Sequence, residues 1–217
     1  MLNNIFEIVW SIPAVLIAIT IHEYSHGRIA YKLGDPTAAE AGRLTLNPLA
    51  HLDPVGTLML LLFRFGWAKP VPVNFNNLNN PKRDMIYVSL AGPIANILTA
   101  VIFAFILRLS YYFIWQITFV QDTTFFNLII TLLRGWLLFL QTGVIINLAL
   151  AIFNLIPVPP LDGSKILLGF LPYPLAYKFA KLESYGYGNV ILLILVFSGV
   201  IGKVLFPIVF FLFRFLV

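Results

Sequence analysis

Long apolar stretches alternate with short polar interruptions along the chain. Four of these stretches, at 5–31, 86–112, 125–156 and 188–216, are long enough to cross a membrane as helices, since a bilayer core about 30 Å thick takes roughly 20 apolar residues. The pattern therefore predicts an all-α integral membrane protein with about four full transmembrane helices. Because no soluble domain, linker or repeat interrupts the pattern, we expect a single polytopic domain over 1–217.

Two interruptions do not fit a spanning helix. In 54–84 an apolar run too short to span is followed by alternating Pro, Val and Asn. We expect a short helix dipping into the bilayer and then an extended loop or small β-hairpin at 66–76, because irregular backbone at that depth needs protein or water to cover it. The second interruption, 154–174, ends the preceding span at Pro157.

Composition agrees with a membrane protein. Hydrophobic residues make up 60% of the chain and charged residues only 11%, against about 25% charged in a soluble domain. The formal charge is +5, but the basic residues flank apolar segments and form no stripe with aromatics, which favours membrane orientation over nucleic-acid binding. The absence of cysteine excludes disulfides and thiolate metal ligands. No basic residue precedes the first apolar run, so we expect a retained helix rather than a cleaved signal peptide.

The basic residues also indicate an orientation. Most of them lie in the segments 32–85 and 157–187, whereas 1–10 and the loop 110–124 hold none. By the positive-inside rule the first helix runs from outside to inside. We therefore expect a multi-pass protein of the cell membrane with its N-terminus outside and both polar interruptions toward the cytoplasm.

Ionisable residues end the first apolar stretch, in the sequence HEYSH at 22–26. On a helix His22 and His26 lie on one face, where both imidazoles can bind one Zn²⁺. Glu23 is placed to take a proton from a metal-bound water. Such groups inside an apolar span are costly and mark functional sites. A catalytic zinc needs a third protein ligand beside an open position.

Two residues are candidates for the third ligand. Asp162, in PPLDG, follows the 125–156 span on the inferred side of the histidines, although it could instead cap a following helix. His51, in NPLAHLDPVG, is the remaining histidine and also suits a loop residue hydrogen-bonded to backbone. Spacing leaves both possibilities open. Asn96, in GPIANIL, is expected to pack helices together beside small residues.

Several motifs, in this order along nearly the whole chain, resemble the site-2 protease family (peptidase family M50), in its small prokaryotic branch without a PDZ domain. They are HEYSHG (22–27), NPLAHLDPVG (47–56), GWAKPVPVN (66–74), AGPIANIL (91–98) and NLIPVPPLDGSKIL (154–167). The family consists of intramembrane zinc metalloproteases. The resemblance implies that His22, His26 and Asp162 bind one zinc ion and that Glu23 is the general base and acid. It also implies that Asn154 lies near the catalytic centre, where its amide could stabilise an oxyanion. The same amide could instead pair with a backbone carbonyl that is freed ahead of Pro157.

The resemblance predicts an intramembrane endopeptidase that hydrolyses transmembrane substrate helices near the cytoplasmic interface. A helix hides its carbonyls in hydrogen bonds, so the substrate must unwind, and an extended enzyme segment could pair with the unwound strand. The candidate substrate clamp is Pro70, Val71, Pro72, Val73 and Asn74. The same segment could simply be a re-entrant loop that closes the cavity, since proline cannot donate to a ladder.

Three alternatives come from different classes. A metal transporter would repeat polar ligands along several spans, and acids are nearly absent from the other spans here. A catalytically inactive relative that binds membrane partners would usually have lost the glutamate of the first motif. Prenyl-protein peptidases share that motif but need a downstream glutamate ligand, and Glu183 in KLESYG is typical of a solvated interface. The pattern identifies neither the substrate nor the oligomeric state.

Overall fold

Helices account for nearly all the regular structure in the computed structural model, which describes residues 2–63, 67–117 and 124–217. In chain order the helices are α1 (Leu2–Lys32), α2 (Thr37–Glu40), η1 (Pro48–His51), α3 (Pro54–Phe63), η2 (Phe75–Asn77), α4 (Pro81–Ile117), α5 (Thr124–Asn154), α6 (Asp162–Phe170), α7 (Tyr173–Ser184), α8 (Tyr187–Phe197) and α9 (Val200–Leu216). The expected all-α class is confirmed.

Three helices are long and apolar enough to cross a membrane. They cover Ile5–Lys32, Pro81–Ile114 and Leu128–Asn154, which matches three of the four expected stretches. A fourth span is possible if α7 and α8, which meet at a bend of 72°, count as one. The described part of the chain therefore has three to four candidate spans.

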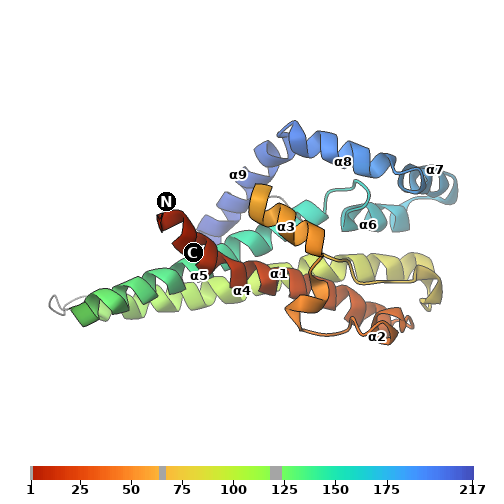
Figure 1. The fold of residues 1–217 in the computed structure, drawn as a ribbon. Helices are drawn as coiled ribbons and strands as arrows, with labels where there is room; N and C mark the ends of the chain where they lie inside the picture. Colours follow the sequence, from red (N-terminus) through yellow and green to blue (C-terminus); the bar gives the residue numbers. More distant parts are fainter. Residues whose placement is uncertain (1, 64–66, 118–123) are drawn as a thin grey trace.

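The fourth expected stretch, 188–216, is two helices rather than one. α8 ends at Phe197 and α9 begins at Val200. Gly199, between them, has a φ of 72°, a left-handed conformation that glycine adopts without strain and that ends a helix. Beyond this break α9 packs on α5 and α4, whereas α8 contacts α7 and α9. The last three helices thus form an arm that leaves the bundle and returns to it (Figure 1).

The bundle of α1, α4 and α5 carries the apolar core. α4 and α5 lie side by side over much of their length, and α1 packs against both (Figure 1). Close approach is possible because small residues stand at the contacts. A Cβ on Gly143 of α5 would lie 2.1 Å from the ring of Phe103 on α4, and one on Gly135 would lie 2.1 Å from Trp10 of α1. Such contacts hold membrane helices by van der Waals packing.

The segment after α3 is extended, as expected for 66–76, although residue 66 lies outside the described residues. It forms no hairpin within the described part of the chain. Its strand-like pairing there is one isolated antiparallel bridge between Leu52 and Ala68, and η2 follows at Phe75–Asn77. The short helix α3 precedes it, also as expected.

Asp35, just after α1, fixes the end of this extended segment. Its Oδ2 accepts a hydrogen bond from the backbone N–H of Asn74 (2.7 Å), and its Oδ1 accepts from the amide of Asn77 (2.9 Å) and from the N–H and hydroxyl of Thr37. The side chain is fully buried. Its carboxylate thereby holds irregular backbone against the end of the first span.

This anchor predicts a pH dependence of stability. Burial acts to raise the pKa of Asp35, but the hydrogen bonds from Thr37, Asn77 and Asn74 outweigh it and lower the pKa below its ordinary value. A carboxylate of this kind stabilises the fold fully above its unfolded pKa of about 3.9, and the contribution is lost as the pH falls through the lower folded value.

We expect Asp35→Asn to destabilise the protein at pH 7 by about 2 kcal/mol, because one strong acceptor becomes a donor. The wild type should lose more stability than the variant as the pH falls below about 4, the ordinary pKa of an aspartate in the unfolded chain. Thermal unfolding in detergent measures both effects, with Glu40→Gln, an exposed carboxylate, as the control. Parallel pH profiles for Asp35→Asn and wild type would contradict the assignment.

Candidate metal centre

Three side chains from distant parts of the chain converge beside α4. His22 and His26 lie one turn apart on α1, and their Nε2 atoms are 3.0 Å apart. The Oδ2 atom of Asp162, the first residue of α6, is 3.2 Å from each of these nitrogens. Both histidines are buried and Asp162 is half-buried. Among the described residues this is the one group of three potential metal ligands.

The partners of the other ring nitrogens decide where the imidazole protons lie. Nδ1 of His22 is 2.5 Å from Oδ1 of Asn96, and Nδ1 of His26 is 2.7 Å from the backbone carbonyl of Val88. Both partners are acceptors, since Nδ2 of Asn96 donates to other groups and leaves its Oδ1 facing His22, so each Nδ1 carries a hydrogen in the neutral ring. Each Nε2 then presents a lone pair. Three electron-rich atoms therefore face one another, an arrangement that a cation stabilises.

The geometry fits a tetrahedral metal ion. Ligands that lie 2.0–2.1 Å from zinc are about 3.3 Å apart, close to the 3.0–3.2 Å spacing found here. Oδ2 of Asp162 is buried and has no hydrogen-bond partner among the described residues. Gly92 of α4 leaves room beside the imidazoles, since a Cβ there would lie 2.4 Å from Nε2 of His26 and 2.7 Å from Nε2 of His22.

A tight loop between α5 and α6 positions Asp162 beside the two histidines. α5 ends at Asn154, three residues before Pro157, and α6 begins at Asp162. Gly163 packs directly on the backbone of the loop, because a Cβ there would lie 2.3 Å from the carbonyl oxygen of Leu155. No side chain caps α6, so Asp162 does not serve as the cap that its sequence also suggested. Its carboxylate points to the histidines instead.

The charge on Asp162 also suits a ligand. Burial acts to raise its pKa, but in the ion-free protein protons taken up by His22 and His26 would pair with the carboxylate, outweigh burial and lower the pKa to about 2; a bound cation would act in the same direction. The carboxylate is therefore ionised at neutral pH, as metal binding requires.

Glu23 lies next to the histidines in sequence and bonds to the extended segment. Its Oε2 accepts a hydrogen bond of 2.8 Å from the backbone N–H of Val71. The side chain is half-buried and Val71 is buried. The candidate proton carrier and the candidate substrate clamp are thus in direct contact.

The remaining sequence candidates lie in other settings. His51 is fully buried, and its Nε2 is 2.8 Å from the carbonyl oxygen of Thr45, which matches the loop role considered for it. Asn154 donates from Nδ2 to the carbonyl of Leu150 at 3.0 Å, one turn back along α5. Glu183 forms an ion pair with Lys165. Neither His51 nor Glu183 belongs to the described ligand group.

Sequence reasoning assigned Asn96 only to helix packing and missed its contact with His22. Its Nδ2 donates to the carbonyl of Ala18 (3.0 Å) and to Oδ1 of Asn147 (2.7 Å), while its Oδ1 faces His22. Asn147 donates onward to the carbonyl of Gly143. Both asparagines are fully buried, so this network joins α1, α4 and α5 and orients one imidazole. The sequence signal that could have indicated this role is a polar asparagine one turn after Gly92 in an otherwise apolar helix.

Comparison with known proteins identifies relatives over most of the chain. The model of Peptidase family M50 matches residues 10–198. A Bacillus subtilis protein, provisionally named zinc metalloprotease YwhC, is 37% identical over 193 residues, which cover 89% of this chain and 82% of that protein. Rip2 of Mycolicibacterium smegmatis, also provisionally named a zinc metalloprotease, is 28% identical over 204 residues, 92% of this chain and 71% of its own length. No solved structure gives a significant match.

The close packing at Gly92 predicts that even one methyl group disturbs the centre. In Gly92→Ala the new Cβ would overlap both imidazoles, so we expect the affinity for Zn²⁺ to fall at least about tenfold, as when ligand orientation is lost. Competition with a chromogenic chelator measures it. Gly202→Ala is the control, since the nearest atom to its Cβ is 3.4 Å away. Equal affinity for Gly92→Ala and wild type would rule out metal binding at this position.

Proposed function

The chain belongs to peptidase family M50, and we propose that it is an intramembrane zinc-dependent endopeptidase that hydrolyses transmembrane substrate helices near the cytoplasmic interface. One zinc ion per chain is held by His22, His26 and Asp162. The observation that carries the proposal is the convergence of three electron-rich ligand atoms within 3.0–3.2 Å of one another in a buried setting. Such an arrangement in a membrane-spanning helix is costly without a cation.

Each residue around the centre has a separate task. When bound, zinc lowers the pKa of a coordinated water to about 7 and stabilises charge on the carbonyl oxygen under attack. Glu23 accepts the proton of the attacking water and later donates it to the leaving amine. The hydrogen bond from Val71 holds one oxygen of Glu23 and so fixes the direction of the carboxylate. Asn96 and the Val88 carbonyl keep the two imidazoles turned so that Nε2 faces the ion.

Asn154 is proposed to stabilise the oxyanion. Its amide nitrogen carries two hydrogens, and the bond to Leu150 uses one of them. The other is available to a substrate oxygen. Removing one such donor typically lowers turnover about 10²-fold or more.

The substrate clamp is proposed at 70–74, with a restricted set of pairing groups. Pro70 and Pro72 have no N–H, and the N–H groups of Val71 and Asn74 are bonded to Glu23 and Asp35. An unwound substrate strand would therefore pair mainly with backbone carbonyls of this segment and with the N–H of Val73. Main-chain pairing of this kind binds extended peptides with little dependence on their sequence.

The proposed orientation places the N-terminus outside and the centre toward the cytoplasmic side. The two basic segments expected there come together in the fold, since Nζ of Lys82 donates to the carbonyl of Leu171 at 2.9 Å. They therefore lie at the same end of the bundle, as one cytoplasmic face requires. A metal transporter is disfavoured because the described residues hold a single cluster of ligands.

The mechanism predicts that Glu23→Gln keeps the metal and loses the activity. We expect cleavage of a labelled transmembrane peptide in detergent to fall about 10²–10⁴-fold, the usual contribution of a general base. A chelator should abolish wild-type cleavage, and added Zn²⁺ should restore it. Glu40→Gln, at an exposed carboxylate, serves as the matched control. Equal cleavage by Glu23→Gln and wild type would eliminate the mechanism.

Zinc stoichiometry tests the third ligand independently of activity. Asp162→Ala removes an anionic ligand and should leave well under one zinc per chain after dialysis. His51→Ala should keep one zinc per chain, although the protein should unfold at a lower temperature because the Thr45 carbonyl loses its partner. Elemental analysis of the purified variants gives the answer. Full zinc occupancy in Asp162→Ala would refute the ligand set.

A further inference from the structure

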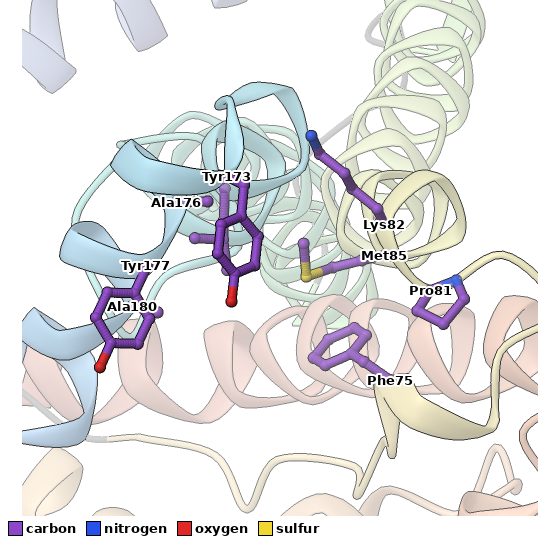
Figure 2. A pocket seen from close by; sticks show the side chains of 9 residues that line it. Phe75, Pro81, Lys82, Met85, Tyr173, Ala176, Tyr177 and Ala180 are labelled. Atoms are coloured by element: carbon purple, nitrogen blue, oxygen red, sulfur yellow. The ribbon is translucent and has the colours of Figure 1, made fainter.

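An apolar cavity of 310 Å³ lies between α4, α6 and α7 (Figure 2). One wall is a face of α7 with residues at helical spacing, Tyr173, Ala176, Tyr177 and Ala180. Met85 of α4 points toward that wall in Figure 2. The volume is at the lower end of the range for small-molecule sites, about 300–1,000 Å³, so it suits part of an acyl chain better than a whole lipid.

Two lysines place positive charge at the edge of this apolar space. Lys82 of α4 contributes to the lining, and Nζ of Lys181 on α7 lies 4.7 Å from the centre of the Tyr177 ring. In the described part of the chain neither lysine has a carboxylate within salt-bridge distance, and Glu183 is paired with Lys165. Lys82 uses one hydrogen on the Leu171 carbonyl, which leaves two more for an anion.

The position along the membrane normal also suits a lipid. Pro81 and Lys82 begin a candidate membrane span, and the end of a span is where acyl chains meet headgroups. Tyr173 and Tyr177 are 81% and 55% exposed, as is common for aromatic side chains at a membrane interface. A peptide is a poorer occupant because both long walls are helices, whose backbone groups already bond within the helix.

We propose that this cavity binds an anionic phospholipid, with one acyl chain against α7 and Met85 and the phosphate held by Lys82. Basic pockets between membrane helices bind acidic headgroups in this way. The lipid contacts α4, α6 and α7 together, and α6 begins with Asp162. Bound lipid therefore raises the thermal stability of the fold through linkage.

The test uses the full chain, delipidated in detergent with a chelator present, so that its outcome is independent of zinc and of peptidase activity. Native mass spectrometry and thermal unfolding follow titration with phosphatidylglycerol, with phosphatidylcholine of the same chains, and with inorganic phosphate. We expect one phosphatidylglycerol per chain, bound about fivefold or more tighter than phosphatidylcholine, since one surface lysine contributes about this much. Inorganic phosphate should not raise the unfolding temperature.

Variants separate the acyl chain from the phosphate. Ala176→Leu fills the cavity and should lower the affinity for both lipids at least fivefold. Ala180→Leu takes its place if the first variant fails to fold. Lys82→Gln should weaken the binding of phosphatidylglycerol more than that of phosphatidylcholine, whose choline cation offsets the phosphate charge, and Lys82→Arg should retain the preference. Ala41→Leu and Lys203→Gln, both at exposed positions outside the cavity, should bind as wild type.

Three results would overturn the proposal. Equal affinity for phosphatidylglycerol and phosphatidylcholine would show that lysine side chains do not select an anionic headgroup. Unchanged binding to both cavity-filling variants would place the lipid elsewhere. The third result concerns a transmembrane substrate peptide. If the peptide displaced phosphatidylglycerol from the wild type and failed to bind to the Ala176→Leu variant, the cavity would be part of a peptide-binding site.

Discussion

Repulsion among three ligand atoms is the constraint around which this fold is organised. Nε2 of His22, Nε2 of His26 and Oδ2 of Asp162 lie within 3.2 Å of one another, and among the described residues Oδ2 of Asp162 has no hydrogen-bond partner while both nitrogens present lone pairs. In the absence of an ion, packing and any proton taken up by an imidazole must hold these atoms together. The tight loop at Gly163 and the absence of a side chain at Gly92 allow this approach, and a bound cation turns the repulsion into attraction.

The histidine pair could be predicted from sequence because its geometry is local. Four residues of helix place both imidazoles on one face, whatever the rest of the chain does. Asp162 is different, since it lies 136 residues after His26, and spacing alone could not choose between it and His51. The resemblance chose Asp162, and the structure brings its carboxylate to the histidines while His51 bonds to a loop carbonyl.

Other features were missed because hydropathy does not describe them. Asn96 was assigned to packing, and it does bridge helices, but its bond to His22 depends on the rotation of α4 against α1. The span expected at 188–216 is equally apolar on both sides of Gly199, so the break depends on one backbone torsion rather than on composition. Hydropathy predicts which segments enter the bilayer, and tertiary contacts decide their rotation and continuity.

Two of the few acidic residues, Asp35 and Glu23, hold the backbone of the extended segment 70–74 in place. Irregular backbone at membrane depth must have its N–H groups satisfied, and two prolines within 70–74 reduce the number that need partners. Asp35 takes the N–H of Asn74, and Glu23 takes that of Val71. The carboxylate proposed to move protons is therefore also part of the structure that holds the extended segment. Since protonation weakens a carboxylate as an acceptor, each proton that Glu23 takes up in the proposed mechanism would also loosen its bond to this segment.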